Sequence, residues 1–138
     1  MFTSTTEIRV RYAHTDQMGY VYYGNYASFF EIARVESLRS IGLSYKALEA
    51  NGIMMPVYEN YSRYLAPAGF DELLTVKVLI KELPSVKITF HYEIFNEANQ
   101  LIHTGYTVLV FINRESRRPC RAPKQLLEAL KPYFEQVA

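Results

Sequence analysis

Residues 25–42, NYASFFEIARVESLRSIG, are the most informative segment for the fold, because their apolar residues recur with the spacing of an α-helix. Tyr26, Phe29, Phe30 and Ala33 stand at positions i, i+3, i+4 and i+7 of one apolar stripe, and Leu38 and Ile41 extend it. A stripe of this width is typical of a helix that packs against a core. Gly42 follows at the position where a glycine commonly ends a helix. The sequence therefore predicts a long amphipathic helix that begins at Asn25.

Alternating apolar and polar residues predict strands on both sides of this helix. Before it, Glu7 to Tyr12 alternates, and its apolar residues Ile8, Val10 and Tyr12 point to one side. After it, four segments have the composition of strands, namely residues 54–64, 74–81, 86–94 and 101–112. Short turns at residues 84–85 and 96–100 join the last three, which predicts an antiparallel meander, with Gly105 as a bulge.

Two short helices complete the predicted order of elements. Ser44 can cap the first, which ends at Gly52, and Pro123 suits the first turn of the second. The order of strand, long helix, four strands and short helix predicts a single α+β domain over residues 1–138, in which one helix packs on one curved sheet. The other face of that sheet is expected to carry Leu79, Leu109 and Phe111, so a second subunit is expected to cover it.

Composition excludes several classes of protein. The 138 residues are 49% hydrophobic, and 15 basic against 14 acidic residues leave a net charge of +1, without the basic excess of a nucleic-acid-binding protein. No apolar run is long enough to cross a membrane, and no secretory signal is visible. The single cysteine, Cys120, predicts a reducing cytoplasm. Because only three scattered histidines accompany it, we expect no metal and no cofactor, and interpret His91 and His103 as structural.

The chemistry is expected in the loop that precedes the long helix. Asp16 lies in that loop with Gly19 and Gly24, which permit sharp turns and a close approach of the backbone to a ligand. The first turn of the helix leaves backbone N–H groups unpaired, and these can bind an oxyanion. An acid facing such a helix start can act as nucleophile or base beside an oxyanion hole. The alternative is that Asp16 is a loop acid or a helix cap.

The segment Asp16-x-x-Gly19-x-Val21-x-Tyr23-x-Asn25-Tyr26 resembles the signature of the 4-hydroxybenzoyl-CoA thioesterase family of hotdog-fold proteins, which includes the YbgC-like acyl-CoA thioesterases. Weaker motifs follow in the family's order, namely Glu31-x-Ala33-Arg34, Tyr64-x-x-Pro67-Ala68 with Asp71-Glu72-Leu73, and Arg118-Pro119-x-Arg121-x-Pro123. The resemblance covers nearly the whole chain. It implies a long central helix wrapped by a curved antiparallel sheet of about five strands. It also implies homodimers or homotetramers, with active sites at the dimer interface.

The resemblance further implies roles for individual residues. Asp16 matches the catalytic aspartate, which acts as nucleophile or as general base for water. Tyr23 matches the residue whose backbone N–H polarises the thioester carbonyl, and its side chain, often His in the YbgC-like branch, is expected to take no part. Gly24, Asn25 and Glu31 match positions that contact the substrate. Glu31 has an alternative role, as a structural acid paired with Arg34 three residues later.

A basic segment near the C-terminus is the candidate site for the phosphates of coenzyme A. Residues 114–124 hold five basic side chains and one acid. Arginines grip phosphate through two hydrogen bonds, so we expect Arg117, Arg118 and Arg121 to bind the phosphates, with Lys87 as a weaker candidate. The alternative is a solvated turn.

The expected function is hydrolysis of an acyl-CoA thioester to a free acid and CoA, in a protein that binds neither nucleic acid nor membrane. An acyl-ACP thioesterase and a non-catalytic acyl-CoA-binding protein are the alternatives, since one fold hosts many functions.

Overall fold

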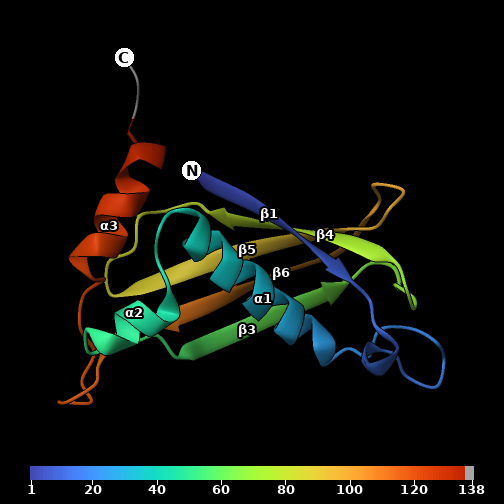
Figure 1. The fold of residues 1–138 in the computed structure, drawn as a ribbon, viewed down its shortest axis with the longest axis horizontal. Helices are drawn as coiled ribbons and strands as arrows, with labels where there is room; N and C mark the ends of the chain where they lie inside the picture. Colours follow the sequence, from blue (N-terminus) through green and yellow to red (C-terminus); the bar gives the residue numbers. More distant parts are fainter. Residues whose placement is uncertain (136–138) are drawn as a thin grey trace.

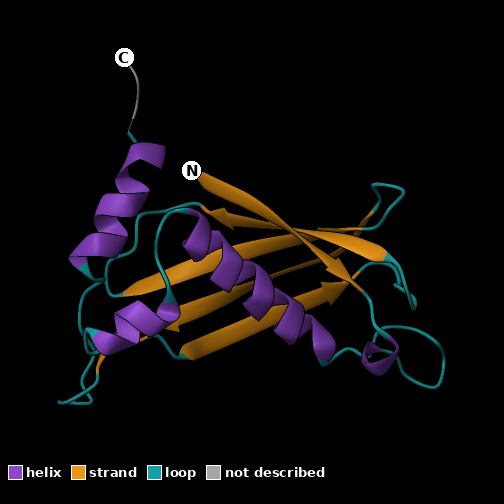
Figure 2. Ribbon diagram, in the orientation of Figure 1, coloured by secondary structure: helices purple, strands orange, loops and turns teal. Residues whose placement is uncertain are grey.

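The computed structural model describes residues 1–135 as one antiparallel sheet of five strands with a helix lying across it (Figures 1 and 2). The strands are β1 (Phe2–Arg9), β3 (Val57–Tyr64), β4 (Leu73–Ile80), β5 (Lys87–Phe95) and β6 (Leu101–Val110). Their spatial order is β1-β4-β5-β6-β3, so β1 and β3 form the two edges. The short strands β2 (Ile53–Met54) and β7 (Ile112–Asn113) pair separately. The α+β class, the antiparallel sheet and the meander are confirmed.

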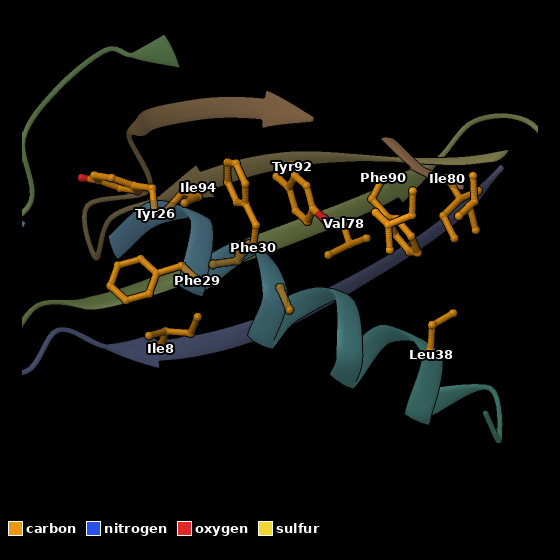
Figure 3. Packing of buried hydrophobic residues seen from close by; sticks show 14 of the residues in the cluster. Ile8, Tyr26, Phe29, Phe30, Leu38, Val78, Ile80, Phe90, Tyr92 and Ile94 are labelled. Atoms are coloured by element: carbon orange, nitrogen blue, oxygen red, sulfur yellow. The ribbon is translucent and has the colours of Figure 1, made fainter. Parts of the chain in front are cut away.

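Helix α1 (Asn25–Ser40) buries its apolar stripe against the sheet. Phe29, Phe30 and Leu38 are fully buried, and Figure 3 shows them among side chains of the strands beneath. The ring of Phe30 stacks on that of Tyr92 in β5, with 4.0 Å between the ring centroids. Burial of this kind, worth about 2 kcal/mol per large side chain, fixes α1 on this face of the sheet.

The predicted end of α1 is confirmed. Gly42 takes φ +83°, the left-handed conformation that glycine adopts without strain. Its N–H donates to the Arg39 carbonyl at 3.0 Å, and the N–H of Leu43 donates to the Leu38 carbonyl at 3.0 Å. These two bonds form a Schellman motif, which satisfies carbonyls that the helix end leaves free.

The two short helices also form as expected. The Ser44 hydroxyl accepts a hydrogen bond from the Ala47 N–H at 3.1 Å and so caps α2 (Tyr45–Ala50). Helix α3 (Lys124–Leu130) begins directly after Pro123 and buries Leu126 and Leu130. Single 3₁₀ turns lie at Tyr12–His14 and Lys131–Tyr133.

Gly105 serves close packing, and the prediction of a bulge there is wrong. Strand β6 pairs with β3 and β5 without interruption at this residue. A Cβ atom at Gly105 would lie 2.3 Å from the Tyr61 carbonyl oxygen and 2.7 Å from Cζ of Phe30. The glycine therefore lets α1 approach the sheet closely at the ring of Phe30.

The prediction that Leu109 and Phe111 lie on the outer face is also wrong, because both are fully buried in the core. Strand β6 is apolar on both faces near its end, so its alternation alone does not define the inner face. Gly105 contacts Phe30 and so belongs to the helix side, and alternation then places Leu109 on that side too. Only Leu79 of the predicted outer set remains apart from this core.

Two element boundaries differ from the prediction. Strand β1 ends at Arg9, which pairs with the first residue of β4, and Tyr12 lies beyond it in a 3₁₀ turn with 78% of its surface exposed. The predicted strand over residues 54–64 is divided into β2 and β3. Pro56 lies in the gap, and a proline has no N–H to donate to a sheet.

Candidate active site

The loop between β1 and α1 is folded as a small closed hairpin that positions Asp16. Thr15 and Val21 pair across it, and the Tyr22 N–H donates to the His14 carbonyl at 2.9 Å. The Asn25 side-chain amide donates to the same carbonyl at 2.7 Å. Asn25 therefore ties the start of α1 to the loop, while its predicted contact with substrate stays a prediction.

Asp16 uses one carboxylate oxygen to hold the tip of this loop. Its Oδ1 accepts the backbone N–H groups of Met18 at 2.9 Å and Tyr20 at 3.3 Å. Gly19 completes the turn with φ +80°, a conformation that favours glycine. Within residues 1–135, Oδ2 of Asp16 receives no hydrogen bond, and the side chain is exposed. The loop thus fixes the carboxylate in place and leaves one oxygen available for chemistry.

Two backbone N–H groups are free where α1 begins. In the part of the chain that the structure describes, the N–H groups of Tyr23 and Gly24 donate to no acceptor. Gly24 precedes the first helical residue, and no side chain caps this end of α1. Unpaired N–H groups at a helix start attract negative charge, so the pair can stabilise an oxyanion.

Asp16 and Tyr23 line one cleft of about 360 Å³. Its walls come from the loop, the first turn of α1 and the segment that follows β3, and the lining residues are Asp16, Tyr20, Val21, Tyr23, Tyr26, Tyr64, Leu65, Ala66 and Pro67. Burial is the largest cause that raises the pKa of Tyr26 to about 12, so its hydroxyl stays neutral. The cleft is lined by a carboxylate, by a residue with a free backbone N–H and by aromatic side chains, a combination suited to attack on a carbonyl in a partly apolar site.

A second cleft, of about 310 Å³, lies farther along the same seam between α1 and β3. It is lined by Ala27, Ser28, Glu31, Arg34, Val57, Asn60 and Thr107. The exposed Glu31 thus lies two turns from the helix start, and no ion pair between Glu31 and Arg34 is present in residues 1–135. The alternative role of Glu31 as the partner of Arg34 is therefore excluded in this structure.

Arg34 instead anchors a buried network of hydroxyl groups. Its Nε donates to the Tyr45 hydroxyl at 2.6 Å, and its Nη1 donates to the Tyr92 hydroxyl at 3.1 Å and to Thr107 Oγ1 at 3.4 Å. Sequence reasoning missed this network. The available signal was the place of Arg34 four residues after Phe30, within the apolar stripe of α1, where a charged residue is rarely buried without a reason.

His103 is structural, as expected. It is fully buried in β6, and its ring stacks on Tyr26 with 4.0 Å between centroids and 3° between planes. Its Nε2 lies 3.0 Å from Ser62 Oγ. Burial lowers the pKa of His103 to about 4, so the ring is neutral at physiological pH. This histidine supports the Tyr26 wall of the cleft from beneath.

The predicted phosphate-binding residues lie away from Asp16. Arg117, Arg118 and Arg121 are exposed on the turn that follows β7, at the opposite end of the long axis from the Asp16 loop (Figure 1). Lys87 lies in β5 and lines a separate cleft, which Lys81 and His91 also line. A single chain therefore does not bring these side chains to the catalytic cleft, and their role stays a prediction.

Over residues 1–135, no group of three or more His, Cys, Asp and Glu side chains is arranged to hold a metal ion. Among the helices of this range, none is both long and apolar enough to span a bilayer. The prediction that no cofactor takes part stays a prediction.

Comparison with known proteins gives a consistent result. Residues 10–130 match the model of the Thioesterase-like superfamily. The acyl-CoA thioester hydrolase YbgC of Escherichia coli O6:H1 is 31% identical over 90% of this chain and 92% of its own length. The crystal structure of DHNA-CoA thioesterase from Staphylococcus aureus has 34% identity and a TM-score of 0.86, covering 99% of this chain and 98% of that one. Protein TT1821 from Thermus thermophilus has 39% identity and a TM-score of 0.87, covering 94% and 98%. This chain therefore belongs to the Thioesterase-like superfamily.

Proposed function

We propose that this protein is an acyl-CoA thioesterase, a hydrolase that converts an acyl-CoA to the free acid and CoA. The observation that carries the proposal is that one cleft is lined both by Asp16, whose Oδ2 is free, and by Tyr23, whose backbone N–H is free. The relatives named above support the substrate class, since two of them bear the names of CoA-thioester hydrolases.

The chemistry follows from these groups. Asp16 either attacks the thioester carbonyl, which gives an anhydride that water then hydrolyses to the free acid and Asp16, or accepts a proton from a water molecule that attacks the carbonyl directly. The carbonyl oxygen gains negative charge, and the N–H groups of Tyr23 and Gly24 stabilise that charge. The intermediate then expels the CoA thiolate. A thiol has a pKa of ~8.5, so its thiolate leaves without a strong general acid, and the site needs no second catalytic side chain for that step.

The side chain of Tyr23 has no part in this scheme. Its ring packs on that of Tyr22, with 4.6 Å between centroids, and only its backbone contributes to the oxyanion hole. Gly24 contributes through its backbone as well. A Cβ atom there would lie 3.0 Å from the Tyr22 ring, tighter than ordinary contact, so the glycine helps to keep this turn compact.

We also propose a homodimer, or a homotetramer built from dimers, with the active sites at the dimer interface. Strand β3 is an open edge of the sheet (Figure 1). Four of its large side chains are exposed, namely those of Val57, Tyr58, Tyr61 and Tyr64. An exposed edge strand rich in large apolar residues is a liability unless another chain covers it. Both clefts open along this edge, because Tyr64 lines one and Val57 lines the other.

Phosphate binding then falls to another subunit. The turn with Arg117, Arg118 and Arg121 and the loop between β1 and α1 lie at opposite ends of the chain (Figure 1), so in this proposal the turn meets the CoA phosphates of a neighbouring subunit's site, with Lys87 as the weaker candidate. The sheet is assigned to the hotdog type, in which it wraps around α1 as the central helix. The single cysteine supports a cytoplasmic location.

The test is a hydrolysis assay on a panel of acyl-CoAs, in which the release of the free CoA thiol is measured. Steady turnover of at least one acyl-CoA is the expected result. The same acyl groups on acyl carrier protein and on pantetheine distinguish a CoA-specific enzyme from an acyl-ACP thioesterase. Tight binding of acyl-CoA without turnover of any thioester would overturn the proposal in favour of a binding protein. Light scattering at micromolar concentration tests the oligomer, and a monomer would contradict it.

A further inference from the structure

Arg34 is a buried cation without a buried anion. Only 5% of its surface is exposed, yet within residues 1–135 no carboxylate forms a salt bridge with it. Its hydrogen-bond partners are three neutral hydroxyl groups, those of Tyr45, Tyr92 and Thr107. Burial raises the pKa of Tyr45 to about 12 and also raises the pKa of Tyr92, so neither hydroxyl supplies a negative charge at physiological pH. Burying a charge in this way costs free energy that a counter-charge normally offsets.

One nitrogen of the guanidinium remains available. Nε and Nη1 donate to the three hydroxyls, whereas Nη2 donates to no acceptor in the described part of the chain. Within residues 1–135, the only side-chain nitrogen or oxygen that is both fully buried and without a hydrogen-bond partner is His103 Nδ1, so Nη2, which has no partner, is not fully buried. It therefore retains contact with the surface, and the surface that Arg34 reaches is the 310 Å³ cleft between α1 and β3. Because the hydroxyl network holds Nε and Nη1 and Arg34 lines this cleft, we expect Nη2 to face it.

The cleft lies within reach of an acyl group bound at Asp16. Tyr23 marks the position of the thioester carbonyl, and Ala27, the first residue of the second cleft, is four residues later. At 1.5 Å per residue the separation along the helix is ~6 Å, and the cleft continues for another ~10 Å to Arg34. Side chains on a helix lean toward its N-terminus, which brings the Arg34 guanidinium back toward the carbonyl. An extended arginine side chain of ~7 Å and a hydrogen bond of ~3 Å together cover ~10 Å of the ~16 Å between the Tyr23 and Arg34 backbones, and an acyl group of roughly four to seven atoms spans the remainder.

We propose that Arg34 is a specificity-determining residue, which selects acyl groups that carry an acceptor oxygen at the end remote from the thioester. The proposal rests on the thioesterase function proposed above and adds to it the chemistry of the acyl group. The acceptor is a carboxylate or a hydroxyl oxygen. A carboxylate supplies the missing counter-charge, and a hydroxyl can accept from Arg34 while donating to Glu31 on the rim. An apolar end leaves the donor unpaired, and sites built to hydrogen-bond a substrate reject such analogues strongly.

The test compares acyl-CoAs in pairs of equal shape. Glutaryl-CoA against 5-methylhexanoyl-CoA probes the carboxylate, and 4-hydroxybenzoyl-CoA against 4-methylbenzoyl-CoA probes the hydroxyl. We expect kcat/KM of the wild type to favour the oxygen-bearing member of at least one pair by about tenfold or more, as a charge-assisted hydrogen bond allows. The pair that shows the preference identifies the acceptor. A wild type that prefers neither oxygen-bearing member overturns the proposal.

Variants separate recognition from support of the fold. Arg34→Met is expected to abolish the preference, so that the kcat/KM ratio within the pair falls to about one. A purely structural role lowers both members alike and leaves the ratio unchanged, which overturns the proposal. If Arg34→Met fails to fold, Arg34→Lys is tested instead, because lysine keeps the positive charge but lacks the planar guanidinium and its separate Nη2 donor. Arg39→Met, on the exposed side of α1, is the matched control and is expected to keep the wild-type ratio.

The two proposals fail in different ways. Absence of turnover with every thioester contradicts the proposed function. Turnover without a preference that depends on Arg34 contradicts only this inference.

Discussion

Replacing Asp16 with asparagine tests the catalytic assignment with little disturbance of the structure. The asparagine side chain keeps an oxygen where Oδ1 of Asp16 accepts the N–H groups of Met18 and Tyr20, so the loop retains its two anchors. Only the free Oδ2 changes, to an amide that is neither a useful nucleophile nor a base. Because the side chain is exposed, we expect the free energy of unfolding to change by less than about 0.5 kcal/mol.

The expected loss of activity is large by comparison. Removing a general base or nucleophile lowers kcat by roughly 10²–10⁴-fold, equivalent to ~2.7–5.5 kcal/mol in the activation free energy. KM should change little, since the oxyanion N–H groups and the cleft walls remain. The assay is release of CoA thiol under saturating substrate, with a thermal melt of each variant alongside. Asp71→Asn is the matched control, because Asp71 is an exposed loop acid at φ +70°, a conformation that asparagine tolerates.

Asp16→Ala distinguishes the two functions of the side chain. It removes the loop anchor as well as the free oxygen, so we expect a further fall in activity and a rise in KM. If both Asp16→Asn and Asp16→Ala retain near-normal hydrolysis, Asp16 is a loop acid and the catalytic assignment is refuted. A single turnover in ¹⁸O-labelled water tests its mode of action, because the carboxylate of Asp16 acquires label only if it acts as the nucleophile.

Three further predictions concern the fold and the substrate. Gly105→Ala should cost about 2 kcal/mol or more of unfolding free energy in urea titrations, since its Cβ would meet a carbonyl oxygen at 2.3 Å, whereas Gly69→Ala, where the nearest atom would be 3.5 Å away, should change it far less. His103 has a pKa of about 4 in the folded chain, below its ordinary 6.5, so on acidification the unfolded chain takes up the proton at a higher pH than the folded chain does. About 3 kcal/mol of unfolding free energy that is present above pH 6.5 should therefore disappear as the pH falls to 4. His103→Phe should make the unfolding free energy less dependent on pH over this range. The double variant Arg118→Ala with Arg121→Ala should raise KM for acyl-CoA severalfold and leave KM for acyl-pantetheine nearly unchanged. Equal effects on the two KM values would show that the turn is a solvated loop that does not bind the phosphates.

The parts of the fold that local chemistry specifies are the parts that the sequence predicts well. The left-handed glycine at Gly42 and the serine cap at Ser44 lie where their backbone requirements place them. The inner face of β6 was not predictable in this way, because apolar residues occupy both of its faces and only the contact of Gly105 with Phe30 decides between them. Local patterns also say nothing of partners distant in sequence.

The candidate site divides along the same line. Asp16 and the glycines of its loop are neighbours in sequence, so their motif can be recognised from the sequence alone. The network around Arg34 joins α1 to α2, β5 and β6, and its hydroxyls lie 11, 58 and 73 residues away. No local sequence pattern predicts a cluster of residues that are this far apart in the chain. The one sign was a charged residue inside an apolar stripe, which indicates a buried role without naming the partners.

The open edge at β3 connects these two parts of the site. If a second copy pairs antiparallel along this strand, the end of one β3 lies beside the beginning of the other. Tyr64, at the end of β3, lines the cleft of Asp16, and Val57, at its beginning, lines the cleft of Arg34. In this arrangement the catalytic cleft of each chain lies next to the recognition cleft of its partner. In that arrangement dimer formation and acyl selectivity depend on the same strand, so a substitution in β3 that separates the subunits should also reduce the preference that Arg34 confers.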